Sequence, residues 1–426
     1  MTTKICSKSK PLKGEITIPS DKSISHRAVI FSSLANGKSV IRNFSKGKDP
    51  LSSLNICKNL GVNIYFYNED IIVEGRGKYF NPVNKNLDCG NSGTTIRLMS
   101  GVLAGQNFDS VLFGDESLSK RPMKRVIEPL TLMGANIESN ENKAPLKIFG
   151  SNLQGIDYQS QIASAQVKSC VLLAGIYASG TTTYKEIYPS RNHTEILLSQ
   201  MGADIDIKNS IISIKSSELK PANIEIPGDI SSAAFFIVAS LIVPNSKIII
   251  KNAGLNPTRS GILKVAQNMG ANIEILDKHE ICGELIGDIK VEYTPNLKAC
   301  NISGEIIPAL IDEIPIIALL SSQAEGTTVI KDAQDLRNKE SDRIKLTVSE
   351  LKKLGVNIEE TQDGMIIHGK SKLTGAAEVN SYKDHRLAMT LYVAGLICEK
   401  EISINDFEWV NISFPEFELL MNTLLN

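Results

Sequence analysis

The segment of residues 22–27, Lys-Ser-Ile-Ser-His-Arg, combines cationic and hydroxyl side chains at the start of an apolar stretch with helical spacing. Lys22 and Ser23 therefore fall at a predicted helix start, and Arg27 lies about one turn later on the same face. An ammonium, a hydroxyl and a guanidinium can together bind a phosphate or a carboxylate. A capped surface helix with solvated charges would give the same pattern, so this segment alone leaves both interpretations open.

Three more segments in the first half of the chain place polar or basic residues before apolar helical stretches. Residues 91–95 read Asn-Ser-Gly-Thr-Thr, and Gly93 would let an anion approach the backbone, although an ordinary helix N-cap explains them as well. Arg121 belongs to the basic turn Lys-Arg-Pro-Met-Lys-Arg, which could bind an anion or simply be solvated. Ser164 and Gln166 occupy the equivalent place before a third helical stretch.

The second half of the chain adds carboxylates to the cations. Asp312 and Glu313 precede an apolar helical stretch, where one could cap the helix and the other could act as a general base. Residues 339–343 read Lys-Glu-Ser-Asp-Arg, which fits either an anion site or an exposed helix start with internal ion pairs. Arg386 lies at the polar edge of another apolar helix. Cations beside a few acids suit the binding of a multiply anionic small molecule.

These candidates occupy equivalent places in a repeated pattern. Six times the chain runs from a polar cluster through an apolar helical segment to a small-residue break and a β-like run, starting near residues 19, 89, 160, 227, 306 and 381. The start of a helix offers free backbone N–H groups and a partial positive charge, which together favour anions. The pattern therefore predicts that the helix starts form the binding site.

A second repeated signature completes each unit. An amphipathic helix ends at a glycine and is followed by an alternating strand, with the glycines at Gly61, Gly134, Gly202, Gly270 and Gly355. A glycine in this place is typical of a left-handed helix C-cap. Each unit then reads strand–helix–strand–helix–strand–strand over about 65–85 residues, longer than a solenoid repeat. We expect an α/β fold of six repeated βαβαββ subdomains.

The repeats also indicate how the chain divides. The stretch that begins at Thr17 matches the stretch that begins at Glu225, which points to a duplication into two halves of three units. We expect an inserted domain of residues 20–226 and a discontinuous domain of residues 1–19 plus 227–426. The active site is expected in the cleft between these two domains.

The composition excludes several other classes of protein. The chain of 426 residues has a formal net charge of −1, so no global field attracts it to nucleic acid or to a membrane. It has no apolar run of membrane-spanning length, and its N-terminus lacks the apolar core of a signal peptide. Its 7 cysteines and 5 histidines are scattered without metal-ligand spacing. We expect a cytoplasmic protein without a metal, a nucleic-acid partner or membrane contact.

Seven motifs follow one another along the chain: SDKSISHR, GNSGTTIRL, KRPM, SAQVKS, NKESDRI, DHRLAM and SFPEF. With them the chain resembles, over nearly its whole length, the 5-enolpyruvylshikimate-3-phosphate synthases (3-phosphoshikimate 1-carboxyvinyltransferases) of the enolpyruvyl transferase family. The family fold is a two-domain assembly of six βαβαββ subdomains. The resemblance implies a transferase of the shikimate pathway, which leads to chorismate and the aromatic amino acids and is the target of glyphosate. Such an enzyme transfers the enolpyruvyl group of phosphoenolpyruvate to the 5-hydroxyl of shikimate 3-phosphate through a tetrahedral intermediate and releases phosphate.

The resemblance also assigns roles to individual residues. Ligands of shikimate 3-phosphate would be Lys22, Ser23, Arg27, Ser164, Gln166, Asp312 and Lys339. Ligands of phosphoenolpyruvate would be Lys22, Gly93, Arg121, Gln166, Arg343 and Arg386. Asp312 would be the base near the attacking hydroxyl, and Glu340 or Lys22 would supply the proton for C3. The scheme uses no cofactor and no metal, and we expect a monomer whose partners are the two small substrates.

One position departs from part of the family. Many members carry a Lys two residues before the Phe-Pro near the C-terminus, where this chain has Ile412. A contact to phosphoenolpyruvate is therefore missing or supplied elsewhere. The motifs SAQVKS and NISFP are typical of the subgroup that is often less sensitive to glyphosate, whereas Gly93 matches many sensitive members. The two indications about the inhibitor conflict.

Two alternatives stand beside this interpretation. A UDP-N-acetylglucosamine enolpyruvyl transferase shares the fold and phosphoenolpyruvate, but usually has Lys-Asn where this chain has Lys22 and Ser23. It also carries a loop Cys before an Arg-Pro, and residues 117–120 here contain none. A non-catalytic anion-binding protein would keep the cations and lose the acids, yet Asp312 and Glu340 are both present.

Overall fold

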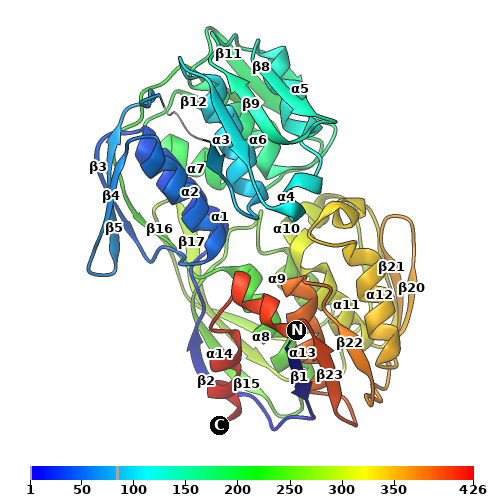
Figure 1. Ribbon diagram of the computed structural model, residues 1–426. Helices are drawn as coiled ribbons and strands as arrows, with labels where there is room; N and C mark the ends of the chain where they lie inside the picture. Colours follow the sequence, from blue (N-terminus) through cyan, green and yellow to red (C-terminus); the bar gives the residue numbers. More distant parts are fainter. Residues whose placement is uncertain (1, 83–85) are drawn as a thin grey trace. The chain divides into compact units, whose positions relative to one another are not determined.

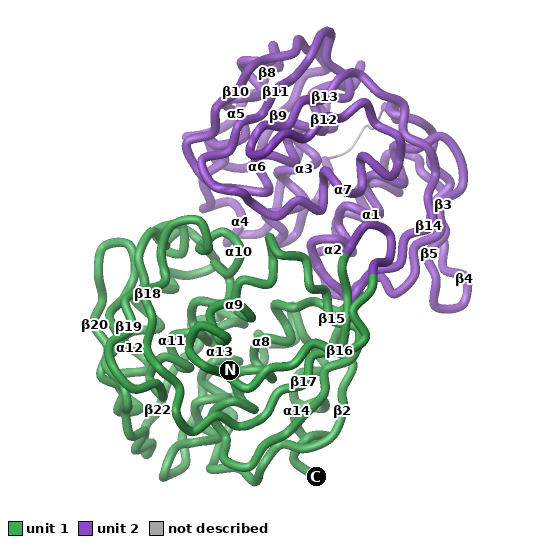
Figure 2. The backbone as a smooth tube through the Cα atoms, turned by 180° about the vertical axis from the view of Figure 1, so that it is seen from behind, with its two compact units in different colours: residues 1–19, 228–279, 285–426 green, residues 20–227, 280–284 purple. Residues whose placement is uncertain are grey.

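The computed structural model describes residues 2–82 and 86–426. They form two compact units, shown in separate colours in Figure 2. Unit 1 comprises Met1–Pro19, Gly228–His279 and Leu285–Asn426, and unit 2 comprises Ser20–Pro227 and Glu280–Glu284. The expected domains stay a prediction, because compactness alone does not show that a unit folds independently.

Unit 1 carries three of the sheets found among the described residues, with strand orders β16-β17-β15-β2, β18-β19-β21-β20 and β1-β23-β22. Its strands are β1 (Thr3–Cys6), β2 (Lys13–Thr17), β15 (Lys247–Gly254), β16 (Asn272–Ile281), β17 (Glu284–Glu292), β18 (Asn301–Ile302), β19 (Gly326–Ile330), β20 (Asn357–Glu360), β21 (Met365–Gly369), β22 (Glu378–Asn380) and β23 (Ile402–Asn405). Its α-helices are α8 (Ile230–Ile242), α9 (Gly261–Asn268), α10 (Ile307–Leu310), α11 (Ile314–Ser322), α12 (Arg343–Lys353), α13 (His385–Gly395) and α14 (Phe417–Leu425). Its 3-10 helices are η1 (Gly304–Ile306), η2 (Ile311–Glu313), η3 (Gln334–Asn338) and η4 (Phe407–Ile412).

Unit 2 carries the other three sheets of the described residues, with strand orders β14-β3-β5-β4, β6-β7-β9-β8 and β10-β11-β13-β12. Its strands are β3 (Asn36–Arg42), β4 (Asn63–Tyr67), β5 (Asp70–Arg76), β6 (Leu87–Asp88), β7 (Ser110–Phe113), β8 (Asn136–Asn140), β9 (Lys143–Phe149), β10 (Asp157–Gln159), β11 (Thr181–Lys185), β12 (Ile205–Lys208), β13 (Ile211–Lys215) and β14 (Asn223–Glu225). Its helices are α1 (Lys22–Leu34), α2 (Lys48–Asn59), α3 (Gly93–Ala104), α4 (Glu116–Lys120), α5 (Lys124–Leu132), α6 (Ala165–Gly175) and α7 (His193–Gln200).

One mixed arrangement of strands recurs in these small sheets. In the sheet β6-β7-β9-β8, β6 runs parallel to β7, and β9 runs antiparallel to both of its neighbours. The parallel pair needs a crossover connection, which α3 supplies between β6 and β7. The sheets β10-β11-β13-β12 and β18-β19-β21-β20 repeat this pattern. The expected α/β fold of six repeated subdomains is confirmed.

Two subdomains exchange their first strands. The strand β2 pairs in parallel with β15, although α1 and β3 follow it in the chain. Conversely, β14 pairs in parallel with β3, although α8 and β15 follow it. The chain passes from unit 1 to unit 2 after Pro19 and returns after Pro227. Each crossing comes shortly after the end of an exchanged strand in the sequence. The sixth sheet has three strands, because β23 pairs with β22 and with the N-terminal β1.

The central helices of each unit are buried on all sides. In unit 2, α3 packs against α6 and α1 packs against α2 and α7 (Figure 1). In unit 1, α11 packs against α8 and α13. Each unit has its own cluster of buried apolar residues. A helix that is covered all round can present polar side chains to a ligand only at its ends, which is where the candidate residues lie.

The glycines predicted to cap helices adopt the expected conformation. Their φ angles are positive at Gly61, Gly134, Gly202, Gly270 and Gly355. Among the described residues, no helix has the length and hydropathy that a membrane span needs.

Candidate functional site

The start of α1 is the first place where predicted site residues lie together. The Asp21 carboxylate caps the helix by accepting a hydrogen bond of 2.7 Å from the backbone N–H of Ile24. The Lys22 ammonium lies 3.2 Å from the carboxylate of Asp49, at the start of α2. Ser23 follows Lys22 and is partly exposed. The cap therefore fixes Lys22 and Ser23 at the rim of the buried helix.

Arg27 lies one turn deeper and is buried. Its guanidinium donates hydrogen bonds to Thr194 Oγ1 (2.7 Å), to Ser169 Oγ (2.7 Å) and to the carbonyl of Ser23 (2.9 Å). These acceptors are all neutral, and no carboxylate of the described residues forms an ion pair with Arg27. Burial lowers the pKa of Arg27 to about 10, so the side chain stays cationic near neutral pH. We call Ser23, Arg27, Ser169 and Thr194 the Arg27 group.

The starts of α3 and α6 bring two more guanidinium groups near Gly93. A Cβ atom on Gly93 would lie 3.0 Å from a terminal nitrogen of Arg97 and 3.3 Å from one of Arg121. The Gln166 side chain accepts a hydrogen bond from Arg97, and Ser164 is the N-cap residue of α6. We call Gly93, Arg97, Arg121 and Gln166 the Arg121 group.

Asp312 is the centre of a charged group in unit 1. Its carboxylate lies 3.4 Å from Lys339 Nζ, 3.4 Å from Arg343 and 3.7 Å from Arg259. The residue lies in η2, and its side chain is 16% exposed. A carboxylate in this place is accessible to a ligand, and the surrounding cations hold it in position.

Glu313 turns the opposite way, into the interior. Its side chain is 1% exposed and lies 3.4 Å from Arg259 and 3.2 Å from Arg386. The Ser231 hydroxyl also donates to it. Arg386 donates a second hydrogen bond, of 3.1 Å, to the backbone carbonyl of Asp312. Glu313 and Arg259 therefore join Arg386 to Asp312.

Arg343, the first residue of α12, is held by three carboxylates. The contacts are 2.6 Å to Glu340, 2.8 Å to Asp384 and 3.4 Å to Asp312. Burial alone would lower the pKa of Arg343, but Asp384, Glu340 and Asp312 together raise it above its ordinary value. Asp384 also caps α13 by accepting hydrogen bonds from the backbone of Arg386 and Leu387. We call Asp312, Lys339, Glu340, Arg343 and Arg386 the Asp312 group.

The structure thus distributes the predicted site residues over both units. Unit 1 brings the Asp312 group together by direct ion pairs. Unit 2 holds the remaining predicted residues, namely Lys22, Ser23, Arg27, Gly93, Arg121, Ser164 and Gln166. The roles of all of these residues stay predictions. Ile412 is partly buried at the end of η4.

Several partners in these groups were not predicted. Arg259 is buried and contacts both acids at the start of α11. Lys22 is paired with Asp49. Arg27 donates hydrogen bonds to Ser169 and Thr194. The sequence signals none of these contacts, since each joins residues far apart along the chain.

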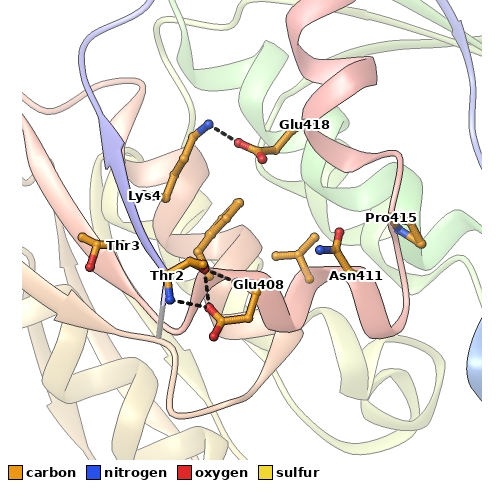
Figure 3. Close-up of a pocket in the computed structure, with 9 residues that line it drawn as sticks. Thr2, Thr3, Lys4, Glu408, Asn411, Pro415 and Glu418 are labelled. Carbon is orange, nitrogen blue, oxygen red and sulfur yellow. Dashed lines mark hydrogen bonds and ion pairs between the residues drawn. The ribbon is translucent and has the colours of Figure 1, made fainter.

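A separate pocket of about 270 Å³ lies in unit 1 near the N-terminus (Figure 3). Its lining includes Thr2, Lys4, Glu408, Asn411 and Glu418. The Lys4 ammonium pairs with Glu418, and the Thr2 backbone N–H donates to Glu408 over 3.0 Å. None of the predicted site residues lines this pocket. Its paired charges fasten the N-terminal strand to η4 and α14.

Comparison with known proteins places these groups in context. A model of the family described as EPSP synthase (3-phosphoshikimate 1-carboxyvinyltransferase) matches residues 6–421. The chain is 55% identical to the 3-phosphoshikimate 1-carboxyvinyltransferase of Thermodesulfovibrio yellowstonii, with 99% of each chain covered. It is 51% identical to the protein of the same description from Bacillus subtilis, with 98% of each chain covered.

Solved structures show the same likeness. An EPSP synthase from Acinetobacter baumannii superimposes with a TM-score of 0.88 at 40% identity, covering 99% of this chain and 98% of that chain. The enolpyruvyl transferase NikO from Streptomyces tendae gives a TM-score of 0.78 at 15% identity, covering 99% and 96% of the two chains. At that identity, the second likeness concerns the fold alone.

Proposed function

The chain belongs to the EPSP synthase family, and on this premise we propose that the Asp312, Arg27 and Arg121 groups bind the substrates of the family's reaction. Its activity is that of a 3-phosphoshikimate 1-carboxyvinyltransferase of the shikimate pathway. The reaction transfers the enolpyruvyl group of phosphoenolpyruvate to shikimate 3-phosphate. The family match decides against the nucleotide-sugar transferase and the non-catalytic protein.

The observation that carries the site assignment is the convergence of Lys339, Arg343 and Arg259 on the Asp312 carboxylate. Asp312 is assigned as the base that takes the proton of the 5-hydroxyl. In the unliganded protein the cations disfavour its protonation. Anionic substrate groups that bind Lys339 and Arg343 would neutralise these cations and make Asp312 a better proton acceptor. The base would then act only when both substrates are in place.

Shikimate 3-phosphate is assigned to Lys22, Ser23, Arg27, Ser164 and Gln166 of unit 2 and to Asp312 and Lys339 of unit 1. Arg27 supports this assignment because it is buried, cationic and bound only to neutral acceptors. Such a guanidinium gains more from an anion than one that already has a carboxylate partner. Lys22, at 30% side-chain exposure, could reach a bound anion directly.

Phosphoenolpyruvate is assigned to Arg343 and Arg386 of unit 1 and to Lys22, Gly93, Arg121 and Gln166 of unit 2. The guanidinium fork suits the planar carboxylate and the phosphate of this substrate. Gly93 supports the assignment, since the lack of a Cβ leaves room beside the terminal nitrogens of Arg97 and Arg121.

Two residues, Glu340 and Lys22, are candidates for transferring the proton at C3, and they have different ion-pair partners in this structure. Glu340 is paired with Arg343 at 2.6 Å, which holds it as a carboxylate without a proton to donate. Lys22 is an ammonium beside Asp49 and can donate. We therefore assign the donation in the addition step to Lys22. Glu340 is assigned the removal of that proton when the tetrahedral intermediate loses phosphate.

We also propose that the chain acts as a monomer in the cytoplasm. The cytoplasm is supported by the cysteines, which are all unpaired, as is typical of a reducing compartment. Sedimentation of the purified protein at several concentrations tests the monomer, and a mass of two chains would contradict it.

The test of the proposed site is phosphate release from phosphoenolpyruvate by the purified protein. Release is expected with shikimate 3-phosphate and not with UDP-N-acetylglucosamine. Substitution of Arg27 by Gln should raise KM for shikimate 3-phosphate, and substitution of Arg386 by Gln should raise KM for phosphoenolpyruvate, each by about tenfold or more. Unchanged KM values in both variants, with normal turnover, would contradict the site assignment.

A further inference from the structure

Lys168 is a fully buried cation that pairs with two buried carboxylates. Its ammonium lies 2.6 Å from Glu195 and 3.0 Å from Glu186, and it donates a third hydrogen bond, of 3.1 Å, to the carbonyl of Ser190. Its side chain is 0% exposed, and both carboxylate side chains are 4% exposed. Taking these charges out of water is costly, and fold stability alone seldom requires a buried ion pair.

Helices α6 and α7, which carry Lys168 and Glu195, also hold Arg27 through the residues next to these two. Ser169 follows Lys168 on α6, and Thr194 precedes Glu195 on α7. The Ser169 and Thr194 hydroxyls lie 2.6 Å apart, and both accept from the Arg27 guanidinium. Thus α6 and α7 meet at two adjacent contacts: one holds Lys168 and the other holds Arg27.

Glu195 is the carboxylate that Arg27 could otherwise bind. Burial lowers the pKa of Arg27, and Glu195 is the group that most strongly opposes this shift. One carboxylate oxygen of Glu195 accepts from Lys168, while Oε2 has no hydrogen-bond partner among the described residues. In a low-dielectric interior, an unneutralised Glu195 would attract the Arg27 guanidinium strongly.

We infer that Lys168 is a positioning residue that neutralises Glu195 and thereby leaves the Arg27 guanidinium available to an anionic group of the substrate. The inference rests on the proposed function, in which Arg27 binds shikimate 3-phosphate. Without Lys168, Glu195 forms an ion pair with Arg27, and the contacts of Arg27 with Ser169 and Thr194 are lost. The Arg27 guanidinium is then neutralised inside the protein and no longer binds the anionic group of the substrate.

The test compares three variants. In Lys168→Met, KM for shikimate 3-phosphate should rise at least about tenfold, while KM for phosphoenolpyruvate stays within about threefold. In Lys168→Met/Glu195→Gln, the competing carboxylate is gone, so KM for shikimate 3-phosphate should return to within about threefold of the wild-type value. Glu186→Gln is the matched control: it removes the other acid, leaves Lys168 on Glu195, and should keep the wild-type KM.

The outcomes separate the possible explanations. A merely structural role of Lys168 predicts that the double variant is as impaired as the single one, which would overturn the inference. A wild-type KM in a folded Lys168→Met would overturn it as well. If Lys168→Met does not fold, the double variant decides alone, because it removes the ammonium of Lys168 and the carboxylate of Glu195 together. A raised KM for shikimate 3-phosphate in the folded double variant then contradicts the inference. The dissociation constants for shikimate 3-phosphate, measured by titration calorimetry, should change in the same direction as the KM values.

A reference variant distinguishes this inference from the proposed function. Arg27→Gln with an unchanged KM for shikimate 3-phosphate would show that Arg27 does not bind this substrate, and the premise would fail. Arg27→Gln with a raised KM, together with a normal Lys168→Met, would leave the premise standing and remove only the role of Lys168.

Discussion

At the scale of the residue, the surroundings of Asp312 decide how it can act as a base. Lys339, Arg343 and Arg259 lie within 3.7 Å of its carboxylate, so the bare side chain is a weak proton acceptor. The same cations are the groups that bound anions would neutralise. With Asp312 as the proposed base, substrate binding and proton abstraction would be coupled through the charge around one carboxylate.

We expect Asp312→Asn to lower kcat by about 10²–10⁴, the usual contribution of general acid–base catalysis. The amide keeps the shape of the side chain and part of its hydrogen bonding, but it cannot accept the proton. Steady-state phosphate release checks the effect. Asp335→Asn is the matched control, because Asp335 also lies near Lys339, at 3.6 Å, and has no assigned role. Equal turnover in the two variants would contradict the assignment of the base.

Gly93→Ala should affect a substrate more than the fold. The new Cβ would lie 3.0 Å from Arg97 and 3.3 Å from Arg121, and these flexible guanidinium ends can move. We expect KM for phosphoenolpyruvate to rise about tenfold, with a smaller effect on the free energy of unfolding. The KM for shikimate 3-phosphate is the internal control. A normal KM for phosphoenolpyruvate would show that Arg121 does not depend on this space.

At the scale of the element, the glycines that end the amphipathic helices differ in the room around them. Gly270 has a φ of +80°, and an added Cβ would meet nothing within 4 Å, whereas in Gly355 the Cβ would lie 2.9 Å from the carbonyl oxygen of Lys372. We expect Gly270→Ala to cost about 1–2 kcal/mol for its left-handed backbone. Gly355→Ala should cost clearly more, because backbone must also move. Urea unfolding measures both, and equal costs would contradict the steric argument.

The buried face of α1 makes the stability of the protein depend on pH. Burial lowers the pKa of His26 from 6.5 to about 3. The unfolded chain binds a proton near pH 6.5 and the folded protein does not, so the stability due to neutral His26 is present above that pH and is lost as the pH falls. The wild type should lose about 2 kcal/mol between pH 7 and pH 5 relative to His26→Gln. Parallel losses in the two proteins would show that His26 does not titrate as inferred.

The elements were predictable from local chemistry, and their partners were not. The cap glycine at Gly355 and the start of α1 at Lys22 were predictable, because certain residue types are strongly preferred at the ends of helices. The family resemblance also assigned Asp312 and Arg343 to the site, but it gave no sign that their side chains contact each other. Arg259 and Thr194 gave no such signal, because a buried arginine or a hydroxyl acquires its role only from side chains that tertiary packing brings to it.

At the scale of the whole molecule, the exchange of β2 and β14 explains why the repeats do not coincide with continuous stretches of chain. Each of these strands completes a sheet whose helices lie elsewhere in the sequence. Likewise, β1 completes the last sheet from the opposite end of the chain. Both units nevertheless enclose a hydrophobic core of their own.

Separate cores predict that the two units can lose structure at different denaturant concentrations. The single Trp, Trp409, lies in η4 of unit 1, so its fluorescence reports on that unit, whereas circular dichroism reports on both. Leu319 of α11 and Leu103 of α3 are fully buried in the cores of units 1 and 2, respectively. Truncation of either to Ala should cost about 2–5 kcal/mol.

Leu319→Ala should therefore lower the urea midpoint seen by Trp409 fluorescence. Leu103→Ala should leave that midpoint nearly unchanged and lower only part of the circular dichroism transition. The two variants are matched in residue type, burial and helical context, so a difference between them comes from the unit that each one weakens. If both variants shift the fluorescence midpoint equally, the two cores unfold as one cooperative body, and a loss of packing in either unit would then disable the binding groups of both.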